Sequence, residues 1–161
     1  MIGLEEGMTE LKSQFLTALR LKVDFAAMAR IGKTPLGNRL IAPVLGGRFE
    51  GPRLTGDVLP GSADWALYRG EDRMLVDVRL TLKTEDGALI YLTYQGALRT
   101  SAEDMVRFKK GEILPKEAFN LRTITRFETG AAQYDWLNDM IGIGVGTQEP
   151  GGVVYQIHEI L

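Results

Sequence analysis

The sequence contains no cysteine and only one histidine, His158, among its 161 residues. Disulfides, thiolate nucleophiles and metal sites built on cysteine are therefore excluded. A centre with three histidine ligands is also impossible within one chain, and no loop carries the Asp-x-Asp-x-Asp-Gly spacing of a calcium hand. We therefore expect neither a metal nor a cofactor, and the lack of cysteine fits a reducing compartment.

An excess of charge of one sign is also missing. The 19 Lys and Arg and 21 Asp and Glu give a formal net charge of -2. Such a chain has no basic field to attract nucleic acid or an anionic membrane surface. No apolar stretch approaches the roughly 18 residues of a membrane-spanning helix, and the acidic N-terminal segment does not read as a secretory signal. We expect a cytoplasmic protein that binds neither nucleic acid nor membranes.

Glycine, in contrast, is plentiful at 19 residues and separates short runs rich in Val, Ile, Leu, Thr and Tyr. This spacing is typical of antiparallel strands joined by turns. The clearest hairpin is predicted at 74–83 and 88–99, because apolar and polar residues alternate in the first run and Asp86-Gly87 lies between the two. Further strands are predicted at 17–27, 39–44, 121–128, 140–146 and 153–160, and short helices at 101–110 and 131–138.

About eight or nine antiparallel strands in one domain must stack as a sandwich or close into a barrel. Closure removes exposed edges, and the glycine-dense stretch 46–56 supplies the corners that bend a sheet. We therefore predict an all-β fold, a closed antiparallel up-and-down β-barrel with one or two short helices. It forms a single domain over 1–161, in which 1–14 are an N-terminal extension. A barrel of about eight strands holds either its own side chains or one small ligand.

Several motifs follow one another along the chain. They are Gly46-Gly47-x-Phe49-x-Gly51-Pro52-x-Leu54-x-Gly56, Val58-Leu59-Pro60-Gly61-x-x-Asp64-Trp65, Asp77-x-Arg79 with Thr84-x-Asp86-Gly87-Ala88-x-Ile90, Arg126-Phe127-Glu128-Thr129-Gly130, and Tyr134-x-Trp136-Leu137-Asn138. In this order they resemble the family catalogued as domain of unknown function 3237, although Ser62 stands where the family more often has a second glycine. The resemblance implies a calycin-like antiparallel barrel, often a homodimer, and implies little about activity.

The first candidate site is Asp64 with Trp65, which follow a Pro-Gly turn. At a barrel mouth, the indole of Trp65 would stack on an apolar ligand. The low dielectric near the indole would raise the pKa of Asp64, so that it could act as a general acid. In the alternative, Asp64 caps a turn with its side chain and Trp65 plugs one end of the barrel.

The second candidate site is Asp77 with Arg79, on one face of the strand 74–83. If this face lines the lumen, Arg79 would bind a carboxylate or enolate and Asp77 would act as a base. If it faces solvent, the two form an exposed ion pair of little energetic value. Periodicity favours solvent, since the Val76 and Val78 face is more apolar, but the family motif includes both polar residues. The choice of face stays open here.

Aromatic residues and an amide provide the remaining candidates. Tyr94 would donate a hydrogen bond to a developing oxyanion, or would be a half-buried tyrosine at the rim. The residues of the last motif would frame a pocket entrance, with Asn138 orienting a carbonyl, or would be a helical turn that closes the barrel. The candidate catalytic residues are Asp64, Asp77, Arg79 and Tyr94, and the candidate substrate-binding residues are Trp65, Phe127, Tyr134, Trp136 and Asn138.

Two glycine motifs do not indicate a nucleotide. Gly142-x-Gly144-x-Gly146 lacks the spacing and context of the dinucleotide fingerprint, and Gly32-Lys33-Thr34 lacks the preceding glycine of a Walker loop. Three functions remain. They are a cofactor-free enzyme (a lyase, isomerase or cyclase) doing acid–base chemistry on a small aromatic or carbonyl-bearing metabolite, a non-catalytic small-molecule carrier, and a structural barrel filled by its own side chains.

Overall fold

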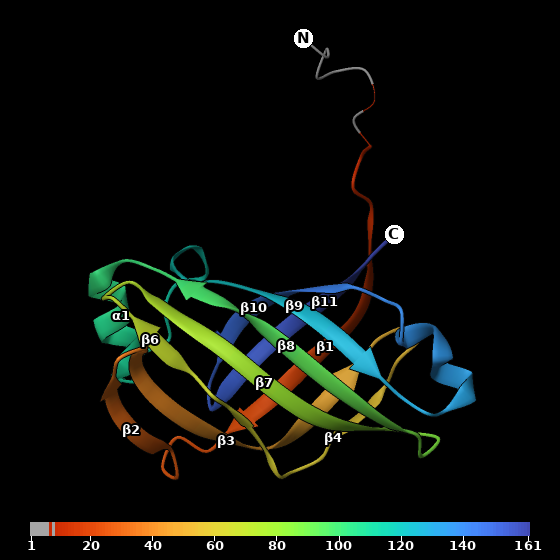
Figure 1. Ribbon diagram of the computed structural model, residues 1–161, viewed down its shortest axis with the longest axis horizontal. Coiled ribbons are helices and arrows are strands. Elements are labelled where there is room, and N and C mark those ends of the chain that lie inside the picture. Colours follow the sequence, from red (N-terminus) through yellow and green to blue (C-terminus); the bar gives the residue numbers. More distant parts are fainter. Residues whose placement is uncertain (1–6, 8) are drawn as a thin grey trace.

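The computed structural model describes residue 7 and residues 9–161. Its strands form one antiparallel sheet that closes on itself (Figure 1). The strands are β1 (Ser13–Val23), β2 (Ala29–Thr34), β3 (Gly37–Glu50), β4 (Gly56–Val58), β5 (Ser62–Asp64), β6 (Leu67–Arg69), β7 (Arg73–Thr84), β8 (Leu89–Arg99), β9 (Asn120–Glu128), β10 (Gly142–Glu149) and β11 (Gly152–Ile160). The helical segments are α1 (Ala102–Lys109) and the 3-10 turns η1 (Lys116–Ala118) and η2 (Ala132–Leu137).

Around the barrel the strands run β1, β11, β10, β9, β8, β7, β4 and β3, and β3 then pairs with β1. The short strands β5 and β6 continue the position of β4 between β3 and β7. The prediction of a closed antiparallel barrel is confirmed. Of the predicted extension 1–14, residues 1–6 and 8 lie outside the described residues, and residues 13 and 14 already belong to β1.

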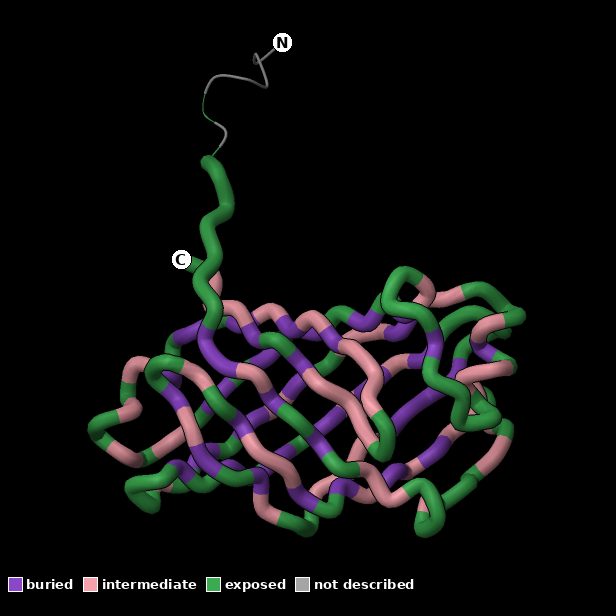
Figure 2. The backbone as a smooth tube through the Cα atoms, turned by 180° about the vertical axis from the view of Figure 1, so that it is seen from behind, coloured by how far each residue is buried: buried purple, intermediate pink, exposed green. Residues whose placement is uncertain are grey.

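The hairpin of β7 and β8 shows which strand face lines the barrel. Val76, Val78, Leu80 and Leu82 are all buried, whereas Arg79 is exposed. Successive side chains of a strand point to opposite faces, so the valine and leucine face is the interior one. Figure 2 shows the same alternation of buried and exposed positions along the other strands.

Several predicted strand bounds were wrong: β3 spans Gly37–Glu50 where 39–44 was predicted, and β2 (Ala29–Thr34) was not predicted. The strand predicted at 17–27 ends at Val23, because the Asp24 carboxylate accepts a hydrogen bond from the Ala27 N–H at 3.0 Å and turns the chain. Phe25, which lies beyond the end of the strand, is consequently 55% exposed. The last hairpin is also tighter than predicted, since β10 and β11 pair as far as Glu149 and Gly152.

Three inward positions of β10 are glycines, and we call Gly142, Gly144 and Gly146 the glycine strip. A Cβ on Gly144 would overlap the Thr123 hydroxyl, and one on Gly146 would lie 2.5 Å from a Leu121 methyl carbon. Side chains of neighbouring strands therefore lean over β10 and fill the interior there. The Gly142-x-Gly144-x-Gly146 motif therefore allows close packing between strands.

Apolar side chains fill much of the barrel, and further elements cover its two ends. Buried Met105 of α1, together with Leu114 and Phe119 after it, packs at one end. Buried Leu137 of η2 packs at the other end, where the blue turn is seen in Figure 1. Among the described residues, no helix has the length and apolar character needed to cross a membrane.

A substitution on β8 tests the close approach of neighbouring strands. A Cβ at Gly96 would overlap the carbonyl oxygen of Arg122, which cannot move without disturbing the ladder between β8 and β9. Gly96→Ala should therefore lower the free energy of unfolding by about 2–3 kcal/mol, measured by urea denaturation. Gly130→Ala is the control, since nothing lies within 4 Å of its Cβ position. Equal stability of the two variants would show that the strands do not approach this closely.

Candidate functional site

Asp64 lies on the interior face of the barrel wall. In β5 it stands opposite Ala42 of β3 and Val78 of β7, and both of these residues are buried. Its Oδ1 accepts a hydrogen bond from the backbone N–H of Asp77 at 3.1 Å. The carboxyl group is thus held among interior residues and has one fixed hydrogen-bond donor.

The surroundings of Asp64 favour its protonated form. Desolvation raises the pKa of Asp64 to about 6, although the hydrogen bond from Asp77 and the charge of Arg39 oppose the rise and the charge of Asp77 adds to it. The Arg39 guanidinium is itself held by the Trp65 carbonyl, at 2.7 Å from Nη1. A carboxyl group with this pKa can both donate and accept a proton near neutral pH.

The charge of Asp64 contributes to raising the pKa of three buried tyrosines. Burial, with the charge of Asp64 adding to it, raises the pKa of Tyr68 to about 12. Burial is also the main cause that raises the pKa of Tyr94 and of Tyr155, and Asp64 again contributes. The rings of Tyr94 and Tyr155 pack with centroids 4.7 Å apart. These phenols keep their protons and can serve as hydrogen-bond donors.

Two threonines of β9 lie beside these tyrosines. Thr125 stands opposite Tyr94, and Thr123 leans toward Gly144, whose Cβ position is 3.5 Å from a Tyr155 ring carbon. They are 0% and 3% exposed, and neither Oγ1 has a hydrogen-bond partner among the described residues. We call Asp64, Tyr68, Tyr94, Tyr155, Thr123 and Thr125 the interior polar cluster.

The structure brings two of the four candidate catalytic residues, Asp64 and Tyr94, into this cluster. The side chains of Asp77 and Arg79 are instead 35% and 50% exposed on the outer face, with 3.7 Å between Oδ2 and Nη2. The open question of which face lines the lumen is thereby answered. Only the backbone N–H of Asp77 reaches the site, through its bond to Asp64.

Trp65 points away from Asp64, although the two are adjacent in sequence. Its ring lies 5.1 Å from the guanidinium carbon of Arg79 on the outer face. Alternation along the extended chain separates the two side chains, so the low-dielectric surroundings of Asp64 come from the barrel interior. Neither the stacking of Trp65 on a ligand in the lumen nor its role as an end plug fits this position.

The other candidate binding residues divide between the interior and the η2 end. Phe127 is buried opposite Leu92 inside the barrel. The Tyr134 hydroxyl donates to Asp86 at 3.0 Å, and the Trp136 ring lies 4.3 Å from the guanidinium carbon of Arg53.

Asn138 belongs to the same end of the barrel. Its Oδ1 accepts from the Thr129 N–H at 2.8 Å and its Nδ2 donates to the Thr129 carbonyl at 3.1 Å. A second Nδ2 bond runs to Asp135 at 3.1 Å. Because most of the amide's hydrogen-bonding capacity is used, Asn138 holds the turn in place.

Residues that sequence reasoning missed include Tyr155, Thr123 and Thr125. A signal for them exists, since Tyr155 alternates with Ile157 on the last strand and both threonines occupy apolar-phase positions of 121–128. The sequence does not show that β10 places Gly144 and Gly142 opposite the two threonines, because this depends on the register between strands. Among the described residues, no group of three or more His, Asp or Glu side chains is placed to hold a metal ion.

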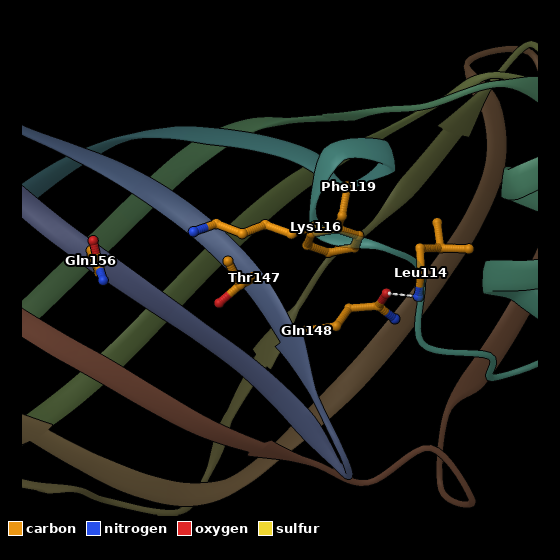
Figure 3. A pocket seen from close by; sticks show the side chains of 6 residues that line it. All are labelled: Leu114, Lys116, Phe119, Thr147, Gln148 and Gln156. Carbon is orange, nitrogen blue, oxygen red and sulfur yellow. Dashed lines mark hydrogen bonds between the residues drawn. The ribbon is translucent and has the colours of Figure 1, made fainter.

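A hollow of about 320 Å³ lies apart from this cluster, between the segment after α1 and strands β10 and β11 (Figure 3). It is lined by Leu114, Lys116, Phe119, Thr147, Gln148 and Gln156. Gln148 Oε1 accepts the Leu114 N–H at 2.8 Å, which ties the segment to the barrel wall. None of the candidate residues lies in it.

Fold and site together define a closed antiparallel β-barrel protein with a polar cluster inside an otherwise apolar interior. Residues 13–160 match the model of the family described as "Protein of unknown function (DUF3237)". The chain therefore belongs to this family, as its ordered motifs indicated.

Bacterial relatives and several solved structures are similar to this chain. A UPF0311 protein of Rhodopseudomonas palustris is 32% identical over 89% of this chain and 97% of its own length. A crystal structure of a protein of unknown function from R. palustris, 27% identical, matches 96% of this chain and 99% of its own with a TM-score of 0.88. A structure described as an enzyme from Penicillium herquei, 18% identical, matches 98% and 100% with a TM-score of 0.73.

The raised pKa of Asp64 makes stability depend on pH. Well below about pH 4 the carboxyl of Asp64 is protonated in both the folded and the unfolded chain. As pH rises, the carboxyl of the unfolded chain ionises first, because its pKa is about 3.9. Stability from this group is therefore lost between about pH 4 and 6. Asp64→Asn should match the wild type at pH 3.5 and exceed its free energy of unfolding by about 2–3 kcal/mol at pH 7. The control is Asp57→Asn on the exposed surface. A constant difference between Asp64→Asn and wild type would disprove the shift.

The outward position of Asp77 and Arg79 is tested by stability as well. An exposed ion pair contributes about 0–1 kcal/mol. Arg79→Ala and Asp77→Asn should each change the free energy of unfolding by less than about 1 kcal/mol in urea titrations. A loss of several kcal/mol in either variant would indicate that the charges are buried.

Proposed function

We propose that the protein is a cofactor-independent enzyme that moves a proton within a small molecule bound inside the barrel, in a lyase, isomerase or cyclase reaction. Asp64 is the proton-transferring group and Tyr94 a hydrogen-bond donor. The observation that supports this most is the inward-facing carboxyl with a pKa of about 6 beside buried tyrosines. Strongly shifted groups of this kind gather at functional sites.

Each group has a defined part in such a reaction. The ionised Asp64 removes a proton from the ligand, and the electron pair left behind moves toward a carbonyl oxygen of the ligand. A phenol hydroxyl of Tyr94 or Tyr155 donates a hydrogen bond to that oxygen as negative charge develops on it. Protonated Asp64 then returns the proton at another atom, so the reaction needs no oxidant or reductant.

The barrel itself supplies the low dielectric that this chemistry needs. Most of the interior consists of buried leucine, isoleucine, valine and phenylalanine side chains. In such surroundings a hydrogen bond to a developing charge is worth more than in water. The barrel from P. herquei described as an enzyme gives a precedent for catalysis on this fold.

A non-catalytic carrier is the second candidate, favoured by the same apolar interior. A carrier needs the binding surface and has no use for a titrating carboxyl. The two functions therefore differ in what Asp64 does after the ligand has bound.

The experiment is a proton-exchange assay that does not require the substrate in advance. The protein is incubated with a metabolite extract in D2O, and mass spectrometry detects compounds that gain deuterium or change structure. Wild-type protein should convert or label one compound, and Asp64→Asn should lower that rate by about 10²–10⁴-fold. Tyr94→Phe should lower it less, and Arg79→Ala on the outer face is the control.

The outcomes separate the candidates. Full activity of Asp64→Asn would refute the role of this carboxyl. A ligand that co-purifies in native mass spectrometry but is neither labelled nor converted would favour the carrier.

A further inference from the structure

The hollow between the segment after α1 and strands β10 and β11 has the features of a second ligand site. We propose that it binds a small organic monoanion, in which a carboxylate group is attached to an apolar body. Lys116 holds the carboxylate, and the ring of Phe119 contacts the apolar body. The site lies outside the interior polar cluster, so it does not depend on the proton transfer proposed for Asp64.

The hollow has room for such a molecule. Its volume of about 320 Å³ lies within the range of about 300–1,000 Å³ that is usual for small-molecule pockets. Thr147 and Gln156 occupy outward positions of β10 and β11, and Phe119 precedes β9 on the other side of the hollow (Figure 3). The ligand therefore binds against the outside of the barrel wall.

The wall formed by the segment after α1 is fixed in place. Gln148 Oε1 accepts the Leu114 N–H at 2.8 Å, and its Nε2 donates to the Glu112 carbonyl at 3.3 Å. Leu114 and Phe119 are buried, and the Phe119 ring packs against that of Phe108 with centroids 5.9 Å apart. Because this wall is held before a ligand binds, binding does not have to order it.

The free charge in the hollow is positive. The Lys116 side chain extends across the hollow toward Gln156 in Figure 3. Among the described residues, no acid lies within ion-pair distance of its ammonium group. Two acids of the adjoining segments already pair with arginines, Glu112 with Arg107 at 2.9 Å and Glu149 with Arg20 at 3.3 Å. An unpaired ammonium in a hollow without an acid in its lining favours an anion.

The other lining groups restrict the class of anion. The Gln156 amide is an uncharged donor, and the Thr147 hydroxyl bonds only to the Val154 carbonyl, at 3.5 Å. One ammonium matches one negative charge, and neutral donors can bond to the remaining lone pairs of a carboxylate. Leu114 and Phe119 give the opposite wall an apolar surface. An inorganic anion would leave that surface in water, whereas an apolar body attached to the carboxylate covers it.

The ligand class is tested with benzoate, which is anionic at pH 7, and benzamide, which has nearly the same shape and no charge. The full-length, isotope-labelled protein is titrated with each probe at millimolar concentration and followed by amide NMR spectra. Benzoate should shift the backbone signal of Leu114 and the side-chain signals of Gln148 and Gln156. Benzamide should bind at least about fivefold more weakly. Equal affinities, or no shift of these signals with benzoate, would overturn the assignment.

A charge-matched pair of variants tests the role of Lys116. Lys116→Gln removes the charge at an exposed position and keeps a long polar side chain, so the fold should be retained. It should weaken benzoate binding by about fivefold or more and leave benzamide binding unchanged. Lys83→Gln is the control, since it removes the same charge from an exposed position of β7 outside the hollow. Wild-type affinity of Lys116→Gln for benzoate would contradict the proposal.

Failure of this proposal is distinguishable from failure of the proposed function. Asp64→Asn should bind benzoate like the wild type, because the hollow does not include Asp64. If benzoate shifts the signals of Tyr94 and Thr125 in place of those of Gln148 and Gln156, it enters the barrel and the outer site is wrong. Loss of proton exchange in Asp64→Asn would leave the outer site unaffected.

Discussion

Closure of the sheet by the pairing of β3 with β1 is the constraint on which the rest of the structure depends. The pairing runs from Ala18 opposite Glu50 to Val23 opposite Val44. It requires Gly47, where any Cβ would overlap the carbonyl oxygen of Arg20. Once the sheet is closed, every strand has one face toward a common interior, and the alternation of side chains decides which residues share it.

Closure also gives each polar side chain on the inner face a desolvation cost. Water cannot easily reach such groups, so they must bond to one another, to the backbone or to a ligand. Asp64 is partly satisfied by the Asp77 N–H, and desolvation by burial raises its pKa. Thr123 and Thr125 are not satisfied at all within the described residues.

Polar residues that the motif suggested for the lumen, Asp77 and Arg79, lie on the outer face of the barrel. Asp77 and Arg79 pair on the surface, and the Trp65 ring packs against Arg79. The three form one cluster outside the segment that carries Asp64, and the backbone of Asp77 holds the Asp64 carboxyl. The polar residues Asp77 and Arg79 thus lie on the outer face of the strand, and their segment contributes to the interior site only through the backbone N–H of Asp77.

Local patterning was sufficient to predict most of the architecture. Alternation and the Asp86-Gly87 turn predicted the β7–β8 hairpin within a residue or two, and the helix over 101–110 corresponds to α1. Such features depend on residues close together in the chain. The early end of β1 was missed because a single Asp24 side-chain bond outweighs a pattern that continues to Phe25.

The sequence by itself determined an all-β chain without cysteine, with one histidine and with strands long enough to close. It also identified Asp64 and Tyr94 as candidates. Only the tertiary structure decided that Asp64 faces inward while Trp65 and Arg79 face outward, and that Tyr155 and two threonines join it. The physical reason is that Asp64, Tyr94, Tyr155 and the two threonines come from β5, β8, β11 and β9, and the register between strands arises only when the barrel closes.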